Sequence, residues 1–152
     1  MFPLSAPECG PRQDRPTDRR GAFCPDRGGT VLMVEDEPEI AHMFRHVFQR
    51  ANLAMTAAAS GREALRLFER TPQAYPLLFV DYCLPDMEGT DLCDHLRTIV
   101  PGLPVLLASG SDRRDAYLQL KLGGPTVFMR KPYLPIDVVW QARSLMRILQ
   151  AA

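Results

Sequence analysis

The stretch that decides the fold reads Leu77-Leu78-Phe79-Val80-Asp81-Tyr82-Cys83-Leu84-Pro85-Asp86-Met87-Glu88-Gly89. An apolar run rich in strand-forming residues ends on an acid, and a proline and a glycine follow within one loop. This pattern predicts a buried strand that carries Asp81 at its carboxyl end. Open α/β sheets bind ligands at that edge. An isolated aspartate in this position more often just opens a turn, so the role of Asp81 depends on the other strands.

From Thr30 onward, short apolar runs alternate with amphipathic stretches. Strands are expected at residues 30–34, 54–59, 77–81, 105–108 and 126–129, with the second of them near a sheet edge. Helices are expected from Pro38, after the capping sequence Ser60-Gly61-Arg62-Glu63, after Gly89, over Asp112 to Leu122, and over about Pro135 to Leu149. Alternating strands and helices imply right-handed crossovers and a parallel sheet covered on both faces. We therefore predict a flavodoxin-like, doubly wound α/β fold with five parallel strands and five helices.

Length and composition set further limits. The 152 residues fit one domain, and Lys plus Arg equals Asp plus Glu at 18 each, so no basic field favours direct binding of nucleic acid. No apolar run approaches the roughly 20 residues of a membrane helix. Residues 1–29 are rich in Pro, Arg and Gly, which predicts a disordered N-terminal tail or linker before a domain at residues 30–150. Arg19-Arg20 is not followed by an apolar region, so we expect a cytoplasmic protein rather than an exported one.

Several reactive side chains follow the predicted strands. The carboxyl ends of parallel strands share one edge, so these side chains should converge there: Glu35, Asp36, Asp81, Ser109 and Lys131. Three carboxylates held together repel one another unless a cation lies among them, and oxygen ligands suit Mg²⁺. A carboxylate nucleophile, a metal ion and two donors are the parts that phosphoryl transfer requires. The sequence has no glycine-rich phosphate loop, which argues against a kinase or an ATPase.

The motifs at the strand ends, taken together, are similar to those of a known family. They are Val34-Glu35-Asp36-Glu37, Val80-Asp81 with Leu84-Pro85-Asp86-Met87-Glu88-Gly89, Leu107-Ala108-Ser109-Gly110, and Lys131-Pro132-Tyr133. In this order and spacing they resemble the response-regulator receiver domain of two-component signalling. The resemblance covers about Gly29 to Leu149.

The resemblance implies a role for each position. Asp81 corresponds to the phosphoacceptor, and Lys131 to the lysine that pairs with the phosphoryl group. The expected Mg²⁺ ligands are Asp36 directly, Glu35 through water, Asp81, and the backbone carbonyl of Cys83. Ser109 would supply the hydroxyl and Phe128 the switch aromatic, and the Lys131–Pro132 peptide is expected to be cis.

The implied function is a phosphoacceptor signalling domain, not an enzyme with an external substrate. It would receive a phosphoryl group from a histidine kinase or a histidine phosphotransfer protein. With only Gln150-Ala151-Ala152 after the last helix, no output domain is expected downstream, and a detached C-terminal receiver of a hybrid kinase is an alternative. A Mg²⁺-dependent aspartyl phosphohydrolase is a second alternative, although such enzymes use an acid where this chain has Cys83. A third is an interaction module that ignores phosphate.

Two surface features remain. Ile136, Trp140, Arg143 and Arg147 share the outer face of the last helix, and Trp and Arg are frequent binding hot spots, so we expect a homodimer or a downstream protein to bind there. A Trp folded over its own helix is the alternative. His42 and His46 lie one helical turn apart without an evident third metal ligand, so exposed polar residues on a partner-facing helix are the favoured interpretation.

Overall fold

The computed structural model describes residues 29–110 and 120–150 of the chain. A single five-stranded sheet forms its centre, with the strands in the order β2-β1-β3-β4-β5. The strands are β1 (Val31–Val34), β2 (Met55–Ala58), β3 (Leu77–Asp81), β4 (Val105–Ser109) and β5 (Thr126–Arg130). Every neighbouring pair is parallel. The sheet is therefore the doubly wound parallel sheet predicted from the sequence, with β2 at an edge as expected.

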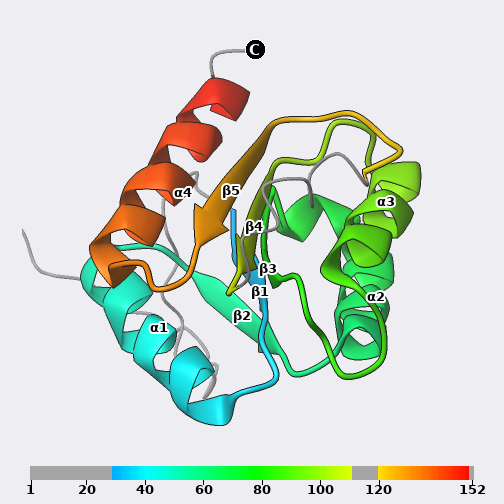
Figure 1. The fold of residues 1–152 in the computed structure, drawn as a ribbon. Coiled ribbons are helices and arrows are strands. Elements are labelled where there is room, and N and C mark those ends of the chain that lie inside the picture. The colour runs from blue at the N-terminus through cyan, green and yellow to red at the C-terminus, as the bar shows by residue number, and fades with distance from the viewer. Residues whose placement is uncertain (1–28, 111–119, 151–152) are drawn as a thin grey trace, which may run out of the picture.

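Four α-helices and one short 3₁₀ helix cover the sheet within the described residues. They are α1 (Pro38–Arg50), α2 (Gly61–Arg70), α3 (Gly89–Ile99), α4 (Pro135–Gln150) and η1 (Pro72–Ala74). Figure 1 shows α1 and α4 packed side by side on one face of the sheet, and α2 and α3 on the other. This two-sided cover confirms the flavodoxin-like prediction.

The number of helices differs from the prediction of five. Most of the helix expected over Asp112 to Leu122 lies outside the described residues. Its last part is described and is not helical, and α3 side chains bind the backbone of residues 121 and 122 there. The Asp94 carboxylate accepts from the N–H groups of Lys121 and Leu122, and Arg97 donates to the carbonyl of Leu122 at 2.9 Å. The tail predicted at residues 1–29 also lies outside the described residues, apart from Gly29.

Two apolar layers hold the sheet between the helices. On the α1 and α4 side, Phe44 and Phe48 pack with Phe79 and Val138, and the rings of Phe44 and Phe79 meet edge to face at 5.2 Å. On the other side, Phe68 and Leu96 pack on the strands. Because β1, β3 and β4 are covered on both faces, every one of their residues is buried. The continuous apolar runs in the sequence follow from this arrangement.

Local signals position the helices that carry the site. Pro38 occupies the first turn of α1, where its missing N–H costs no hydrogen bond. Ser60 caps α2: its Oγ accepts from the N–H of Glu63 at 3.2 Å, and the Glu63 carboxylate accepts from the N–H of Ala59 at 2.7 Å.

In residues 29–110 and 120–150, no helix is both long enough and apolar enough to span a bilayer.

Candidate functional site

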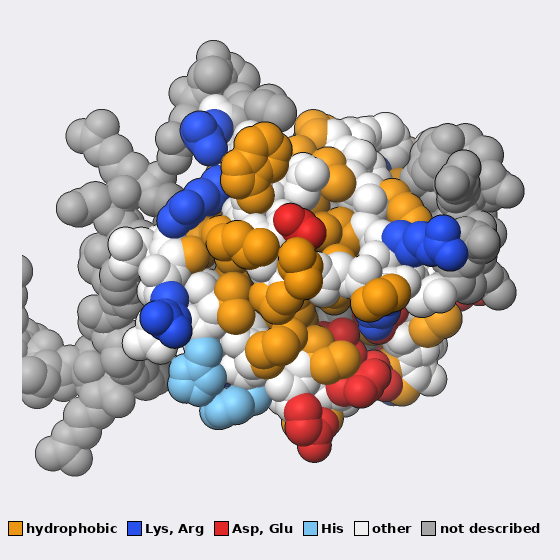
Figure 2. Space-filling model, turned by 60° about the vertical axis from the view of Figure 1, so that its left-hand side comes forward, with side chains coloured by type: hydrophobic (Ala, Val, Ile, Leu, Met, Phe, Trp, Pro, Cys, Tyr) orange, Lys and Arg blue, Asp and Glu red, His pale blue; other side chains and the backbone are white. Residues whose placement is uncertain are grey.

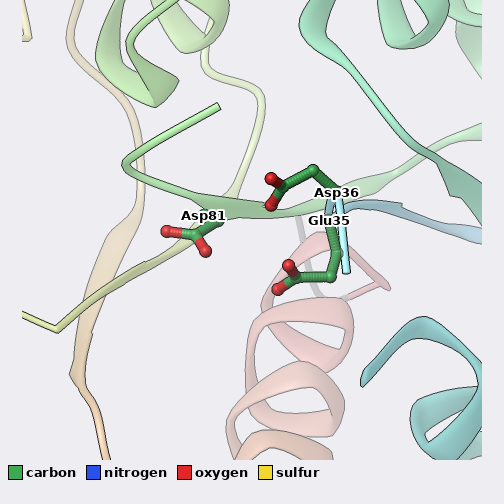
Figure 3. Close-up of side chains that lie close together, drawn as sticks. All are labelled: Glu35, Asp36 and Asp81. Carbon is green, nitrogen blue, oxygen red and sulfur yellow. The ribbon is translucent and has the colours of Figure 1, made fainter. Parts of the chain in front are cut away.

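Three acids meet at the carboxyl edge of the sheet. β1 and β3 are neighbours with Val34 opposite Val80, so the residues that follow them are placed next to each other. Carboxylate oxygens of Glu35, Asp36 and Asp81 lie within 4.8 Å of one another. Figure 3 shows the three side chains gathered at the ends of these strands. The convergence predicted from the sequence is confirmed for this group.

Lys131 brings a positive charge to the same place. Its Nζ lies 2.6 Å from Oδ2 of Asp81, and the pair is mostly buried, with side-chain exposures of 27% and 10%. Its backbone N–H donates to the carbonyl of Ser109 at 2.8 Å, which fixes the start of the loop after β5. The Lys131–Pro132 peptide is cis, as expected. Burial opposes the charged ammonium, but the hydrogen bond and negative charge of Asp81 outweigh it and raise the pKa of Lys131.

Glu35 is the most buried of the three acids. Burial is the main reason that its pKa is raised to about 6, and the negative charge of Asp81 adds to this effect. A hydrogen bond from the N–H of Glu37, 3.1 Å long, acts in the opposite direction. Burial raises the pKa of Tyr133, and the negative charges of Glu35 and Asp81 add to this effect. The cluster thus remains rich in negative charge despite Lys131.

The loop after β3 fits closely around Asp81. Its Oδ1 accepts from the N–H of Cys83 at 3.2 Å, and the N–H of Gly89 donates to the carbonyl of Tyr82 at 2.6 Å. A Cβ at residue 89 would collide with the backbone carbonyl oxygen of Asp81. The glycine in the motif therefore permits the close approach of α3 to the strand end.

Asp86 has a structural role that the sequence did not reveal. Its two carboxylate oxygens accept from the N–H groups of Gly61 and Arg62, each at 2.9 Å, at the start of α2. These hydrogen bonds, that from Arg62 first, lower the pKa of Asp86. The acid of the loop motif thus ties the loop to a helix that begins 25 residues earlier.

The remaining predicted residues lie at or near the same edge. Ser109 is the buried last residue of β4, next to Asp81 and Lys131 through their strands. Phe128 is half-buried on β5, opposite Leu107, and packs against the layer beneath α2 and α3. Cys83 is exposed and forms an isolated antiparallel bridge with Glu88. The structure gives their positions, and the roles implied by the resemblance remain predictions.

Comparison with known families identifies this constellation. Residues 31–141 match the model of the response regulator receiver domain. The chain belongs to this family. Receiver domains are signalling domains of two-component systems, interact with histidine kinases or phosphotransfer proteins, and generally bind Mg²⁺ at an acidic pocket.

Curated proteins and solved structures agree with this assignment. The receiver is 36% identical over 119 residues to the probable transcriptional regulatory protein TcrX of Mycobacterium tuberculosis, covering 78% of this chain and 50% of that protein. It is 32% identical over 120 residues to the transcriptional regulatory protein CreB of Escherichia coli, covering 78% and 51%. The chain thus spans about half the length of these relatives. A receiver domain structure from Clostridium thermocellum superposes with a TM-score of 0.74 at 22% identity, covering 81% of this chain and 98% of that one, which supports the fold.

The residues of this receiver suit the metal ion of the family. The three carboxylates supply hard oxygen ligands, and Lys131 pairs with just one of them, so the cluster stays anionic. A divalent cation would favour the charged form of Glu35, whose pKa is raised mainly by burial and further by the negative charge of Asp81. Glu35, Asp36 and Asp81 are therefore the side chains fitted to hold Mg²⁺.

The expected partner face of the receiver lies on α4. Ile136 and Trp140 are 64% and 65% exposed, so the Trp is not folded into the core. Arg143 donates to the carbonyl of Ala51 at 2.7 Å and thereby closes the end of α1, while Arg147 is exposed. Figure 2 shows the apolar side chains of this side of the molecule gathered into a patch, with basic side chains along one border. Nearby, a hollow of about 330 Å³ opens between α1 and α4.

Proposed function

We propose that this receiver accepts a phosphoryl group on Asp81 from a histidine kinase or a histidine phosphotransfer protein in a Mg²⁺-dependent reaction. The observation that carries the proposal is the position of the Asp81 carboxylate, which lies between the ammonium group of Lys131 and the carboxylates of Glu35 and Asp36. Among the three acids, Asp81 is the one that pairs with Lys131. A nucleophile placed among charge-neutralising groups is the arrangement that phosphoryl transfer requires.

In the proposed step, a carboxylate oxygen of Asp81 forms a bond to phosphorus while the bond from phosphorus to the donor's imidazole nitrogen breaks. The nitrogen keeps the electron pair, and the product is an acyl phosphate on Asp81. Lys131 pairs with the phosphoryl oxygens, and the hydroxyl of Ser109 donates to another of them. Asp36, Asp81 and the backbone carbonyl of Cys83 would hold Mg²⁺ directly, and Glu35 would hold it through water. Mg²⁺, when bound, neutralises charge on the phosphoryl oxygens.

Phosphorylation would then change the surface of the receiver. Ser109 moves toward the phosphoryl group, and Phe128, one strand away on β5, changes its packing. Both residues lie on the strands nearest to Lys131, which supports their coupling. The change is a population shift between two packings, because the phosphoryl group binds one of them more tightly. This shift would change the face formed by β5 and α4, including Trp140, and that face would then bind a second copy or a downstream protein.

The test is Mg²⁺-dependent labelling by a small phosphodonor such as acetyl phosphate, followed by intact-protein mass spectrometry. The unaltered chain should gain one phosphoryl group, and EDTA should prevent it. Asp81→Asn should abolish labelling. Asp91→Asn is the matched control, because Asp91 is an exposed acid in the first turn of α3 and is not part of the acidic cluster. Labelling that survives in Asp81→Asn would refute the assignment.

The relatives suggest the setting in which the receiver works. TcrX and CreB are named as transcriptional regulatory proteins, and the receiver matches about half of each. We propose that residues 30–150 serve as the cytoplasmic receiver of such a signalling pathway. The alternative is the receiver of a hybrid kinase. A receiver from a histidine kinase of Syntrophus aciditrophicus has a TM-score of 0.71, but at 24% identity that likeness supports the fold alone. The neighbouring coding sequence separates the two settings, since a hybrid kinase requires an adjoining kinase core.

A further inference from the structure

Two histidines on α1 face each other outside the acidic site. His42 and His46 are exposed and four residues apart, so they lie on the same face of the helix. Their Nε2 atoms are 3.2 Å apart, and the two rings meet nearly at right angles, with centroids separated by 4.7 Å. One imidazole N–H donates to the lone pair of the other ring. The two Nε2 atoms therefore face each other across one hydrogen bond.

That separation is the one that a bound metal ion requires. Two imidazole nitrogens that bind Zn²⁺ at about 2.0 to 2.1 Å with a tetrahedral angle lie about 3.3 Å apart. The observed Nε2–Nε2 distance of 3.2 Å is close to this value, so binding requires the two rings to turn toward a shared ion but not to move apart. A metal ion can replace the shared proton once both Nε2 atoms present lone pairs. The helix backbone has already placed the two rings, so little conformational entropy is lost on binding.

We propose that His42 and His46 form a surface site for a divalent transition-metal ion of the Ni²⁺, Cu²⁺ and Zn²⁺ class. The two Nε2 atoms are the protein ligands, and water fills the other positions. Imidazole nitrogen suits these ions, whereas Mg²⁺ prefers oxygen, so the pair would not compete for the cation of the acidic site. Among the described residues, no third His, Cys, Asp or Glu joins His42 and His46 to form a group of three close ligands. One side of the histidine site is therefore open to water. Figure 2 shows histidine side chains on the same face as the apolar patch near α4.

Calorimetric titration with Ni²⁺ tests the site in the untagged full chain. Accessible thiols are alkylated, and Mg²⁺ is present in excess so that the oxygen site is filled. The unaltered chain should bind one Ni²⁺. His42→Gln and His46→Gln should each weaken binding by about tenfold or more, because one imidazole alone cannot chelate. The remaining histidine, His95 on α3, is the matched control, and His95→Gln should bind as the unaltered chain does.

The proposal is overturned if the unaltered chain binds no Ni²⁺, if either variant at 42 or 46 binds as tightly as the unaltered chain, or if His95→Gln weakens binding equally. Imidazole signals in NMR spectra give a second readout that does not depend on a variant folding. Addition of Zn²⁺ should shift the signals of two histidines and leave the third in place. Equal shifts of all three would overturn the assignment. Phosphoryl labelling of Asp81 is unaffected by the outcome, so failure of this site and failure of the proposed function are distinguishable.

Discussion

Asp81 differs from its two acidic neighbours in what its oxygens contact. Oδ2 pairs with the ammonium of Lys131, and Oδ1 accepts from the backbone of Cys83. Glu35 instead accepts from the N–H of Glu37, on its own strand end. The two kinds of contact support different roles, with Asp81 as the group that reacts and Glu35 and Asp36 as holders of the cation.

Glu35 should make the metal-free receiver less stable as pH rises. Its pKa in the folded chain is raised from 4.5 to about 6 by burial, so the folded state holds the proton more tightly than the unfolded state. Stability from this group is present below about pH 4.5 and falls as pH rises to about 6, by about 2 kcal/mol at most. Urea unfolding of the unaltered chain and of Glu35→Gln, both without Mg²⁺, measures the difference. Identical pH dependence in the two would contradict the prediction.

Gly89→Ala should disturb the site without touching a reactive group. The added methyl group would run into the backbone carbonyl of Asp81 and the Cα of Tyr82, so the loop or α3 must move. We expect a loss of about 1 to 3 kcal/mol in the free energy of unfolding, together with slower phosphoryl labelling. Gly123→Ala is the control, because nothing lies within 4 Å of a Cβ there. Denaturant titration gives the comparison, and equal stability of the two variants would count against the tight fit.

The reactive residues were predictable from the sequence, whereas the contacts that hold the loops around them in place were not. Parallel strands place their last residues at one edge whatever the loops do, so Glu35, Asp81 and Lys131 could be brought together by pattern alone. The contacts of Asp86 with the start of α2 depend on the path of a loop. No local pattern encodes such a contact between distant residues.

At the level of elements, α3 holds the segment that leads into β5. Arg97 is 2% exposed, and burial lowers its pKa. Its guanidinium donates to the carbonyls of Leu103, Leu122 and Pro125 and to the hydroxyl of Thr126, at 2.8 to 3.2 Å. One side chain thus joins the end of α3 to the strand that precedes Lys131. The start of β5, the strand that leads to Lys131, is therefore tied to α3.

Arg97→Met should destabilise the receiver by about 2 kcal/mol or more, because carbonyl groups that it serves lose their donor. Thermal or denaturant unfolding monitored by circular dichroism measures the loss. The control is Arg66→Met, an exposed arginine on α2. If Arg97→Met were as stable as Arg66→Met, the anchoring role would be wrong.

The boundaries of all five strands agree with the sequence prediction to within one residue at each end, because apolar runs and turn residues mark them directly. The end of the expected helix at residues 120–122 is different. Helical propensity favours a helix there, but Asp94 and Arg97 take the backbone groups that a helix would use. The side chains of α3 override the local helical preference at these residues. A sequence window around residues 120–122 does not include Asp94 and Arg97, so it could not predict this outcome.

At the scale of the whole molecule, the two faces of the sheet differ in what they expose. The α1 and α4 side carries the most exposed large apolar residues of the described chain, Leu134, Ile136 and Trp140, each about two thirds exposed. Exposed apolar side chains that gather on one face are typical of a binding surface. This face is joined to the acidic site through β5 and Lys131, so it is well placed to respond to phosphorylation.

Trp140→Ala should weaken phosphorylation-dependent self-association or partner binding by about tenfold, since truncation of a Trp hot spot costs 1 kcal/mol or more. Light scattering with and without a small phosphodonor measures self-association, and titration with the partner measures affinity. Ile99→Ala is the control, an exposed apolar residue on α3. Unchanged self-association and unchanged partner affinity in Trp140→Ala would reject this face.

The central claim is that Asp81 is the residue that becomes covalently modified. Borohydride reduces an aspartyl phosphate to homoserine, so treatment of the labelled chain followed by peptide mass spectrometry marks the phosphorylated residue. We predict homoserine at position 81 when Mg²⁺ is present, and unmodified acids at positions 35, 36 and 86. A mark at any of those three positions, or none at 81 in a chain that has taken up phosphate, would contradict the account.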